Sequence, residues 1–293
     1  MLQLYIQMQQ ICNSRATRSI LEFMETLHVL FWALAGSVLS LIGGIALAKS
    51  SKKRQTFIKY ALPFGAGAML ATAFMVTLPE ALHGDLESAT VLVWALGGFL
   101  GFFVLERLLG WFHHHHHDDN VDGARDKTHT YLVIIGDTLH NAIDGVALGA
   151  AFLVNPAAGV SMALAVAAHE IPQEVGDFGI LLAKGMAKKK VILVNLSSAL
   201  ATVVTAMSVY LLGGAAGFDA SPLLAIAAGM FIYIAASDII PDIHERPRGE
   251  GRAQSLMLLL GVVIIGGVAL ALPHSHEYEH DAEATSSHHE HNH

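Results

Sequence analysis

Long apolar stretches that alternate with short polar segments dominate the sequence. A helix of roughly 20 residues is needed to cross the hydrocarbon core of a bilayer, and eight stretches reach this length. They lie near residues 28–48, 60–82, 91–112, 131–154, 159–183, 191–214, 222–242 and 254–272. The pattern therefore predicts an all-α, polytopic membrane protein built as an eight-transmembrane-helix bundle.

The composition agrees with this pattern, because 53% of the residues are hydrophobic and 14% are charged, whereas soluble domains carry about 25% charged residues. The pattern also divides the chain into three parts. An N-terminal segment (1–27) precedes the transmembrane domain (28–272), and a tail rich in histidine and acids (273–293) follows it. A histidine-rich loop (113–130) separates the third and fourth stretches.

Lysine and arginine are concentrated in alternate connections between the apolar stretches. They follow the first, third, fifth and seventh stretches, and they are absent from residues 83–90, 155–158 and 213–221. Basic loops tend to remain in the cytoplasm. This alternation predicts that both termini are extracytoplasmic and that the histidine-rich loop is cytoplasmic.

Polar residues interrupt the fourth and fifth stretches near their middles. At about 100° per residue, the polar residues of the fourth stretch share an arc of roughly 100°, and those of the fifth share an arc of roughly 140°. The fourth-stretch set is Asp137, His140, Asn141 and Asp144, and the fifth-stretch set is His169, Glu170, Gln173, Glu174 and Asp177. We expect these two faces to meet inside the bundle.

Charged groups in hydrocarbon cost about 2.5–3.5 kcal/mol each, so these faces must meet each other, a water-filled cavity or a cation. Imidazole nitrogen together with carboxylate oxygen suits zinc, iron(II), manganese or cobalt. A proton relay is an alternative, since Asp, Glu and His chains also conduct protons. A membrane-embedded metalloenzyme (hydrolase) is another, although the zinc-protease pattern His-Glu-x-x-His fails at Gln173.

Further polar residues mark the two ends of the predicted pathway. Acids at both mouths would raise the local concentration of a cation. The outer candidates are Glu80 and His83, and the inner candidates are Asp177, Asp238, Asp242 and His244. A run of five histidines in the cytoplasmic loop is predicted to capture metal with low affinity; it comprises His113, His114, His115, His116 and His117.

Glycines recur at short spacing in the first three stretches. In lipid, helices associate through close backbone packing, so glycine predicts tight helix contacts. These positions include Gly65 and Gly67 in the second stretch and Gly97, Gly98 and Gly101 in the third.

The sequence HNAIDG at 140–145, followed by HEIPQEVGDF at 169–178, resembles the paired signatures of the ZIP (Zrt/Irt-like) divalent metal transporters, most closely their LIV-1-like branch. The resemblance implies that the protein is not an enzyme and that it imports zinc into the cytoplasm, with iron(II), manganese or cadmium as companions. Zinc would then be the transported substrate, and no cofactor is expected.

The resemblance also implies a ligand set. The main site would draw on His140, Asp144, His169 and Gln173. Asn141 and Glu170 would serve an adjacent second site, and Met69 matches a methionine that approaches the metal in some members. Gln173 stands where many members have a carboxylate or histidine, and residues 191–214 contain no acid. These departures predict one main ion, held moderately, rather than a two-metal centre.

Other expectations concern the surroundings of the protein. We expect a multi-pass protein of a bacterial cytoplasmic (inner) membrane. The lipid bilayer and divalent metal ions are the expected partners, homodimers are common in the resembled family, and no nucleic-acid partner is expected.

Overall fold

The computed structural model describes residues 15–47, 50–114 and 122–271, and these residues form helices and short connections without any β-strand. The helices are α2 (Arg15–Leu47), α3 (Ser51–Thr72), η1 (Ala73–Thr77), α4 (Leu78–His83), α5 (Ser88–His114), α6 (Asp122–Val154), α7 (Pro156–Ala183), α8 (Lys188–Ala216), α9 (Ser221–Ile234), η2 (Ala235–Ile239), α10 (Ile240–Glu245) and α11 (Arg248–Ala271).

The predicted all-α membrane bundle is confirmed, because the described residues of each predicted stretch fall within one continuous helical rod. Two rods are compound: α3, η1 and α4 form one, and α9, η2 and α10 form another. Two helices extend beyond the predicted membrane spans. The first helix begins at Arg15, inside the segment assigned to 1–27, and α6 begins at Asp122, so much of the predicted 113–130 loop is helical. Polar residues obscured both helix starts.

Six of the described rods are long and apolar enough to cross a membrane. The fourth and fifth predicted spans, α6 and α7, do not reach this hydropathy, because their charged residues lower it. Neighbouring helices cover these two helices and separate their polar residues from lipid. α6 packs against α8, and α7 packs against α2 and α3.

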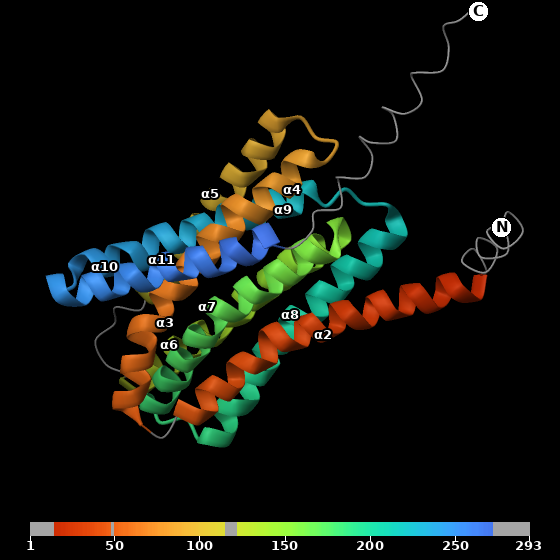
Figure 1. Cartoon of the computed structure of the whole chain (residues 1–293). Helices are drawn as coiled ribbons and strands as arrows, with labels where there is room; N and C mark the ends of the chain where they lie inside the picture. The colour runs from red at the N-terminus through yellow and green to blue at the C-terminus, as the bar shows by residue number, and fades with distance from the viewer. Residues whose placement is uncertain (1–14, 48–49, 115–121, 272–293) are drawn as a thin grey trace, which may run out of the picture.

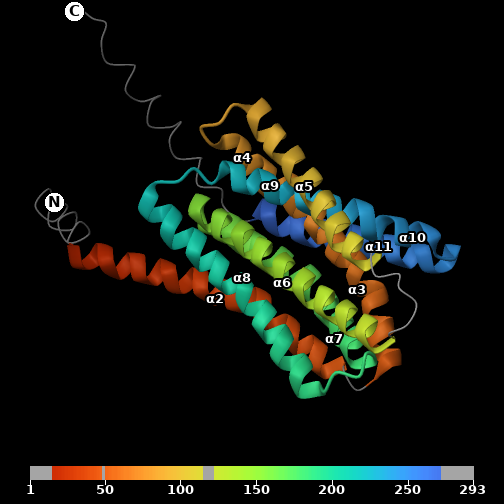
Figure 2. The ribbon, with the colours of Figure 1, turned by 180° about the vertical axis from the view of Figure 1, so that it is seen from behind.

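The helices form two groups, which both views show side by side (Figures 1 and 2). We call α2, α6, α7 and α8 the site group, and α3, α4, α5, α9, α10 and α11 the support group. Within the support group, α3 packs on α11 and α5 packs on α9. The groups meet mainly where α3 lies against α7.

Glycine determines how closely the support-group helices approach. A Cβ atom at Gly67 of α3 would overlap the backbone carbonyl of Leu258, and one at Gly98 of α5 would overlap that of Ile226. The prediction of tight packing is confirmed at these two positions. It is wrong for Gly97 and Gly101, which face open space among the described residues.

The junction between α6 and α7 is a single residue, Asn155. Its side-chain oxygen accepts a hydrogen bond of 2.7 Å from the backbone N–H of Ala158, which caps α7. Pro156 occupies the first turn, where a missing N–H leaves no bond unmade. Because this turn is so short, α6 and α7 lie as antiparallel neighbours and their polar faces stay in register.

Candidate metal centre

The polar faces of α6 and α7 meet at four buried side chains: His140, Asp144, His169 and Glu170. Each offers one ligand atom, and these atoms lie within 4.8 Å of one another. The Nε2 atom of His169 lies 2.8 Å from Oδ2 of Asp144, and that of His140 lies 3.4 Å from Oε1 of Glu170. The two Nε2 atoms are 3.4 Å apart. We call these four residues the cluster.

The backbone orients one of the two imidazoles. Nδ1 of His169 lies 2.9 Å from the carbonyl oxygen of Ala165, one turn earlier in α7. The carbonyl can only accept, so Nδ1 carries the proton, and in the neutral ring Nε2 keeps its lone pair. That lone pair faces the carboxylate of Asp144. A cation bound between the two would remove the repulsion between the nitrogen lone pair and the carboxylate oxygen.

Three of the four carboxylate oxygens of the cluster lack a hydrogen-bond partner among the described residues. Neither oxygen of Glu170 has a hydrogen-bond partner among the described residues, and the same is true of Oδ1 of Asp144. Both side chains are 0% exposed. A buried, unpaired charge is costly, and two imidazole nitrogens with two carboxylates form a donor set suited to zinc. The cluster therefore fits a divalent cation.

Aromatic rings enclose the two histidines. Phe102 of α5 packs edge-on against His140, with ring centroids 6.1 Å apart, and Phe231 of α9 packs against His169 at 5.6 Å. These contacts come from the support group, so both groups enclose the cluster although one group supplies its ligands.

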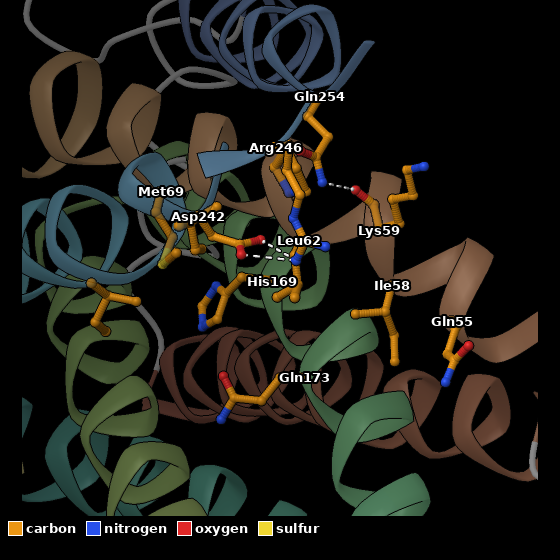
Figure 3. A pocket seen from close by; sticks show the side chains of 13 residues that line it. Gln55, Ile58, Lys59, Leu62, Met69, His169, Gln173, Asp242, Arg246 and Gln254 are labelled. Atoms are coloured by element: carbon orange, nitrogen blue, oxygen red, sulfur yellow. Dashed lines mark hydrogen bonds and ion pairs between the residues drawn. The ribbon is translucent and has the colours of Figure 1, made fainter. Parts of the chain in front are cut away.

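A cavity of about 550 Å³ leads away from the cluster. His169, Gln173 and Met69 line it near the cluster, and Gln55, Arg246 and Gln254 line it near the ends of α3, α10 and α11 (Figure 3). Those ends adjoin the lysine- and arginine-rich connections. The cluster is thus accessible from the side that the charge pattern assigns to the cytoplasm.

The candidate ligands outside the cluster lie in two surroundings. Gln173 and Met69 border the cavity beside His169. Asn141 instead faces α8: its Nδ2 donates to Oδ1 of Asp137 at 3.0 Å, and its Oδ1 accepts from the hydroxyl of Thr202 at 2.8 Å. The amide of Asn141 is therefore engaged in joining α6 to α8.

Deeper along α7, Glu174 is completely buried and neither of its oxygens has a hydrogen-bond partner within the described part of the chain. Asp137 is 7% exposed, and Asp177 is half-buried. A second cavity, of about 370 Å³, is lined by Asp137, Asp177, His140 and Gln173.

Sequence reasoning missed one acid of this second cavity. Glu106 of α5 lines it, and its carboxylate accepts a hydrogen bond of 2.5 Å from the hydroxyl of Tyr233 on α9. A glutamate inside a long apolar stretch, with Arg107 beside it, is itself the signal that could have found it. The contact also ties α5 to α9 within the support group.

The predicted outer residues lie at the end of α4. Glu80 is 6% exposed and accepts a hydrogen bond of 3.0 Å from Nδ2 of Asn155, so it joins the support group to the α6–α7 junction. His83 is exposed, and its Nδ1 donates to the carbonyl of Pro79 at 2.7 Å.

At the inner end, Asp242 and His244 are exposed. Asp242 accepts two hydrogen bonds from Arg246, at 2.8 and 3.0 Å, and these bonds raise the pKa of the Arg246 guanidinium. The side chain of Asp238 and those of His113 to His117 lie outside the described residues.

Comparison with known proteins agrees with this geometry. The family model for the ZIP zinc transporters matches residues 26–123 and 112–269, which is most of the chain. The match includes all four residues of the cluster.

Individual proteins that are similar to this chain are also named as zinc transporters. The chain is 40% identical to zinc transporter ZIP10 of Mus musculus over 154 residues, which is 48% of this chain and 18% of that protein. It is 40% identical to zinc transporter foi of Drosophila melanogaster over 140 residues (48% and 19%), and 39% identical to zinc transporter ZIP4 of Mus musculus over 137 residues (47% and 20%). The matched region thus spans about a fifth of these relatives. They belong to the LIV-1 branch, so the predicted resemblance is confirmed.

Proposed function

Because the chain belongs to the ZIP zinc transporter family, we propose that it carries divalent zinc across a membrane into the cytoplasm, with the cluster as its binding site. One observation carries the proposal: four buried ligand atoms from α6 and α7 converge within 4.8 Å. The matched proteins are named as transporters, not as enzymes, so the hydrolase alternative is set aside.

The cluster explains how zinc would be bound. His140 and His169 supply imidazole nitrogens, and Asp144 and Glu170 supply the charge that balances the cation. Glu170 supports the same ion, because its Oε1 lies 3.4 Å from Nε2 of His140 and 3.8 Å from that of His169. Gln173 and Met69 border the exit cavity beside His169. A single compact set of ligands supports one main ion.

The proposed direction rests on the cavity beside His169 and on the charge pattern. The cavity extends to the ends of α3, α10 and α11, next to the basic connections. Asp242 lies along this exit, and Glu80 and His83 lie at the opposite end of the bundle. The histidine run 113–117 would receive zinc on the cytoplasmic side.

Iron(II), manganese and cadmium are proposed as companion substrates, because imidazole–carboxylate sets discriminate weakly among such ions. Zinc is cargo in this proposal and not a resident cofactor. The lipid bilayer is the surrounding medium, a homodimer is the proposed assembly, and a bacterial cytoplasmic membrane is the proposed location.

The test is the uptake of radioactive zinc by proteoliposomes that contain the full chain. We expect the His140→Ala/His169→Ala double variant to lower the initial rate at least about tenfold, because even the partners of metal ligands change affinity about 10–100-fold. His28→Ala is a matched control: this exposed histidine on α2 accepts a hydrogen bond from Trp32 and does not contact the cluster.

Equal loading by the wild type and the double variant would contradict the proposed site. Proton flux without zinc uptake would favour the proton-conducting alternative. Turnover of a peptide or lipid without zinc uptake would return the enzyme to consideration.

A further inference from the structure

The boundary between the site group and the support group is open on the inner side of the cluster. The cavity of about 550 Å³ lies between α7 of the site group and α3, α10 and α11 of the support group. The second cavity, of about 370 Å³, lies between α6 and α7 of the site group and α5 of the support group. The two groups are therefore separated by space at and below the level of the cluster.

On the outer side of the cluster, the same boundary is closed. One buried hydrophobic cluster includes Val76 of η1, which is 4% exposed, and Met162 of α7, which is 0% exposed. One turn beyond Val76, Glu80 of α4 accepts the hydrogen bond of 3.0 Å from Nδ2 of Asn155. Glu80 and Asn155 are 6% and 7% exposed. A buried polar contact thus joins the two groups at the outer end.

Asn155 uses the two ends of its amide for different purposes. Its oxygen caps α7 by accepting from the backbone N–H of Ala158, and its nitrogen donates to Glu80. The cap needs only an oxygen, so the bond to Glu80 is an additional contact. Asn155 is also the only residue between α6 and α7, which carry all four residues of the cluster. A contact at Asn155 therefore positions both ligand-bearing helices against the support group.

The contact with Glu80 is suited to reversible opening. Oε2 of Glu80 is buried without a hydrogen-bond partner among the described residues, and a buried polar atom without a partner is costly. The connections at this end (83–90, 155–158 and 213–221) contain no lysine or arginine that could neutralise the carboxylate. Separation of the two groups at the outer end would let water hydrate both oxygens of Glu80, which offsets the loss of the bond to Asn155.

We propose that the hydrogen bond between Glu80 and Asn155 is an outer latch, which keeps the outer half of the boundary closed while the inner half is open. Breaking the latch opens the boundary to the outer side. This proposal rests on the proposed function and names two positioning residues, which act on the cluster through α6 and α7 and do not bind the ion.

The test compares variants that keep the cap of α7 and remove only the donor to Glu80. Asn155→Asp and Asn155→Ser both retain an oxygen that caps a helix well, and neither supplies the amide nitrogen. In Asn155→Asp, the new carboxylate also repels Glu80. Glu80→Gln/Asn155→Asp exchanges donor and acceptor, because the glutamine can donate to the aspartate, and it should restore the latch.

The measurement is the labelling rate of an introduced cysteine by a membrane-impermeant maleimide, in the full chain with its single native cysteine removed (Cys12→Ser). Met162→Cys reports the outer half, because Met162 lies seven residues from both Asn155 and His169. It is labelled from outside in intact cells. Ile58→Cys reports the inner cavity, which Ile58 lines, and it is labelled in inverted membrane vesicles.

Asn155→Asp and Asn155→Ser should raise outer labelling of Met162→Cys about three- to fifteenfold, the range that corresponds to interhelical hydrogen bonds in membranes. Inner labelling of Ile58→Cys should fall in the same variants. Glu80→Gln/Asn155→Asp should return both rates to within about twofold of those with the latch intact, the margin expected of a restored hydrogen bond. Glu87→Gln, at an exposed acid in the connection before α5, is the matched control and should change neither rate.

Three results would overturn the latch: unchanged outer labelling in both Asn155 variants, faster labelling at both reporters, which indicates a loosened fold, or failure of the exchanged pair to reverse the change. None of these results depends on zinc, so each leaves the proposed function intact. Absence of zinc uptake by the wild type would instead overturn the proposed function, whatever the labelling rates.

Discussion

The site group and the support group place their polar groups differently. In the site group, carboxylates and imidazoles lie buried in the middle of α6 and α7, and several oxygens lack a partner within the described residues. In the support group, α3–α11 and α5–α9 meet through glycines at which a Cβ atom would overlap the facing backbone. Close glycine packing also occurs in the site group, because a Cβ atom at Gly145 or Gly149 of α6 would overlap the backbone of α8. The buried imidazoles and acids of α6 and α7 are therefore what distinguishes the site group.

The difference indicates which group mainly determines stability and which mainly determines metal binding. Helices in lipid gain stability from close packing, which the support group achieves through Gly67, Gly98, Gly229 and Gly261. Buried carboxylate oxygens without a hydrogen-bond partner destabilise the site group, and a bound cation offsets this destabilisation. A substitution in the support group should therefore change folding first, whereas one in the cluster should change zinc binding first.

The largest expected effect separates binding from stability within the site group. Glu170→Gln should lower zinc affinity at least about tenfold, because mutating a residue that only hydrogen-bonds to a metal ligand already lowers metal affinity about 10–100-fold. Removing a buried charge without hydrogen-bond partners should at the same time raise the melting temperature of the zinc-free protein. Zinc titration and thermal unfolding, in detergent with and without a chelator, measure the two effects. A lower zinc-free melting temperature would contradict the view that Glu170 is destabilising until it binds a cation.

The second effect concerns the support group. Gly98→Ala should cost about 1–3 kcal/mol of stability through overpacking, since its Cβ would overlap the carbonyl of Ile226. The adjacent Gly97→Ala is a matched control in open space, and it should be neutral or stabilising. Thermal unfolding of both variants checks this contrast. Equal losses at the two positions would show that close packing at Ile226 is not the cause.

A third, smaller effect concerns the polar contact between α6 and α8. The hydroxyl of Thr202 donates to Asn141, so Thr202→Val leaves Oδ1 of Asn141 without this donor. Interhelical hydrogen bonds in membranes contribute about 0.6 kcal/mol on average and about 1.7 at most. Thermal unfolding should show a loss in this range. A larger loss would mean that hydrogen bonding, and not only packing, stabilises the site group.

The smallest effect concerns the exposed Asp242–Arg246 pair. Arg246→Gln should change stability by less than about 1 kcal/mol, because solvent screens exposed ion pairs. The zinc-free melting temperature should therefore remain close to that of the wild type. A clear destabilisation would show that polar contacts at the helix ends also hold the support group together.

The sequence was sufficient to predict the bundle and the convergence of α6 and α7. The spacing of His140 and Asp144 placed two ligands on one helical face, and the cost of burying them implied a partner face. Their convergence with His169 in one place follows from this reasoning.

The allocation of residues within that face was not predictable. Helix-wheel arithmetic gives an arc but not the tilt of one helix against another, so it could not show that Glu170 joins the cluster while Gln173 borders the cavities. The contact of Asn141 with Thr202 was not predictable either, because it depends on how α8 packs against α6. Glycine spacing likewise did not distinguish Gly98 from its neighbour Gly97, because contact depends on the facing helix.

The contact at Gly65 has a consequence for how the metal specificity of this fold could change. A Cβ atom at Gly65 would lie 2.9 Å from the Cα atom of His169, so any larger residue there displaces the backbone that carries a ligand. Gly65 belongs to α3, which contributes none of the four cluster ligands. Divergence among related chains, or laboratory selection for another metal, could therefore alter ion preference through a position that never touches the ion.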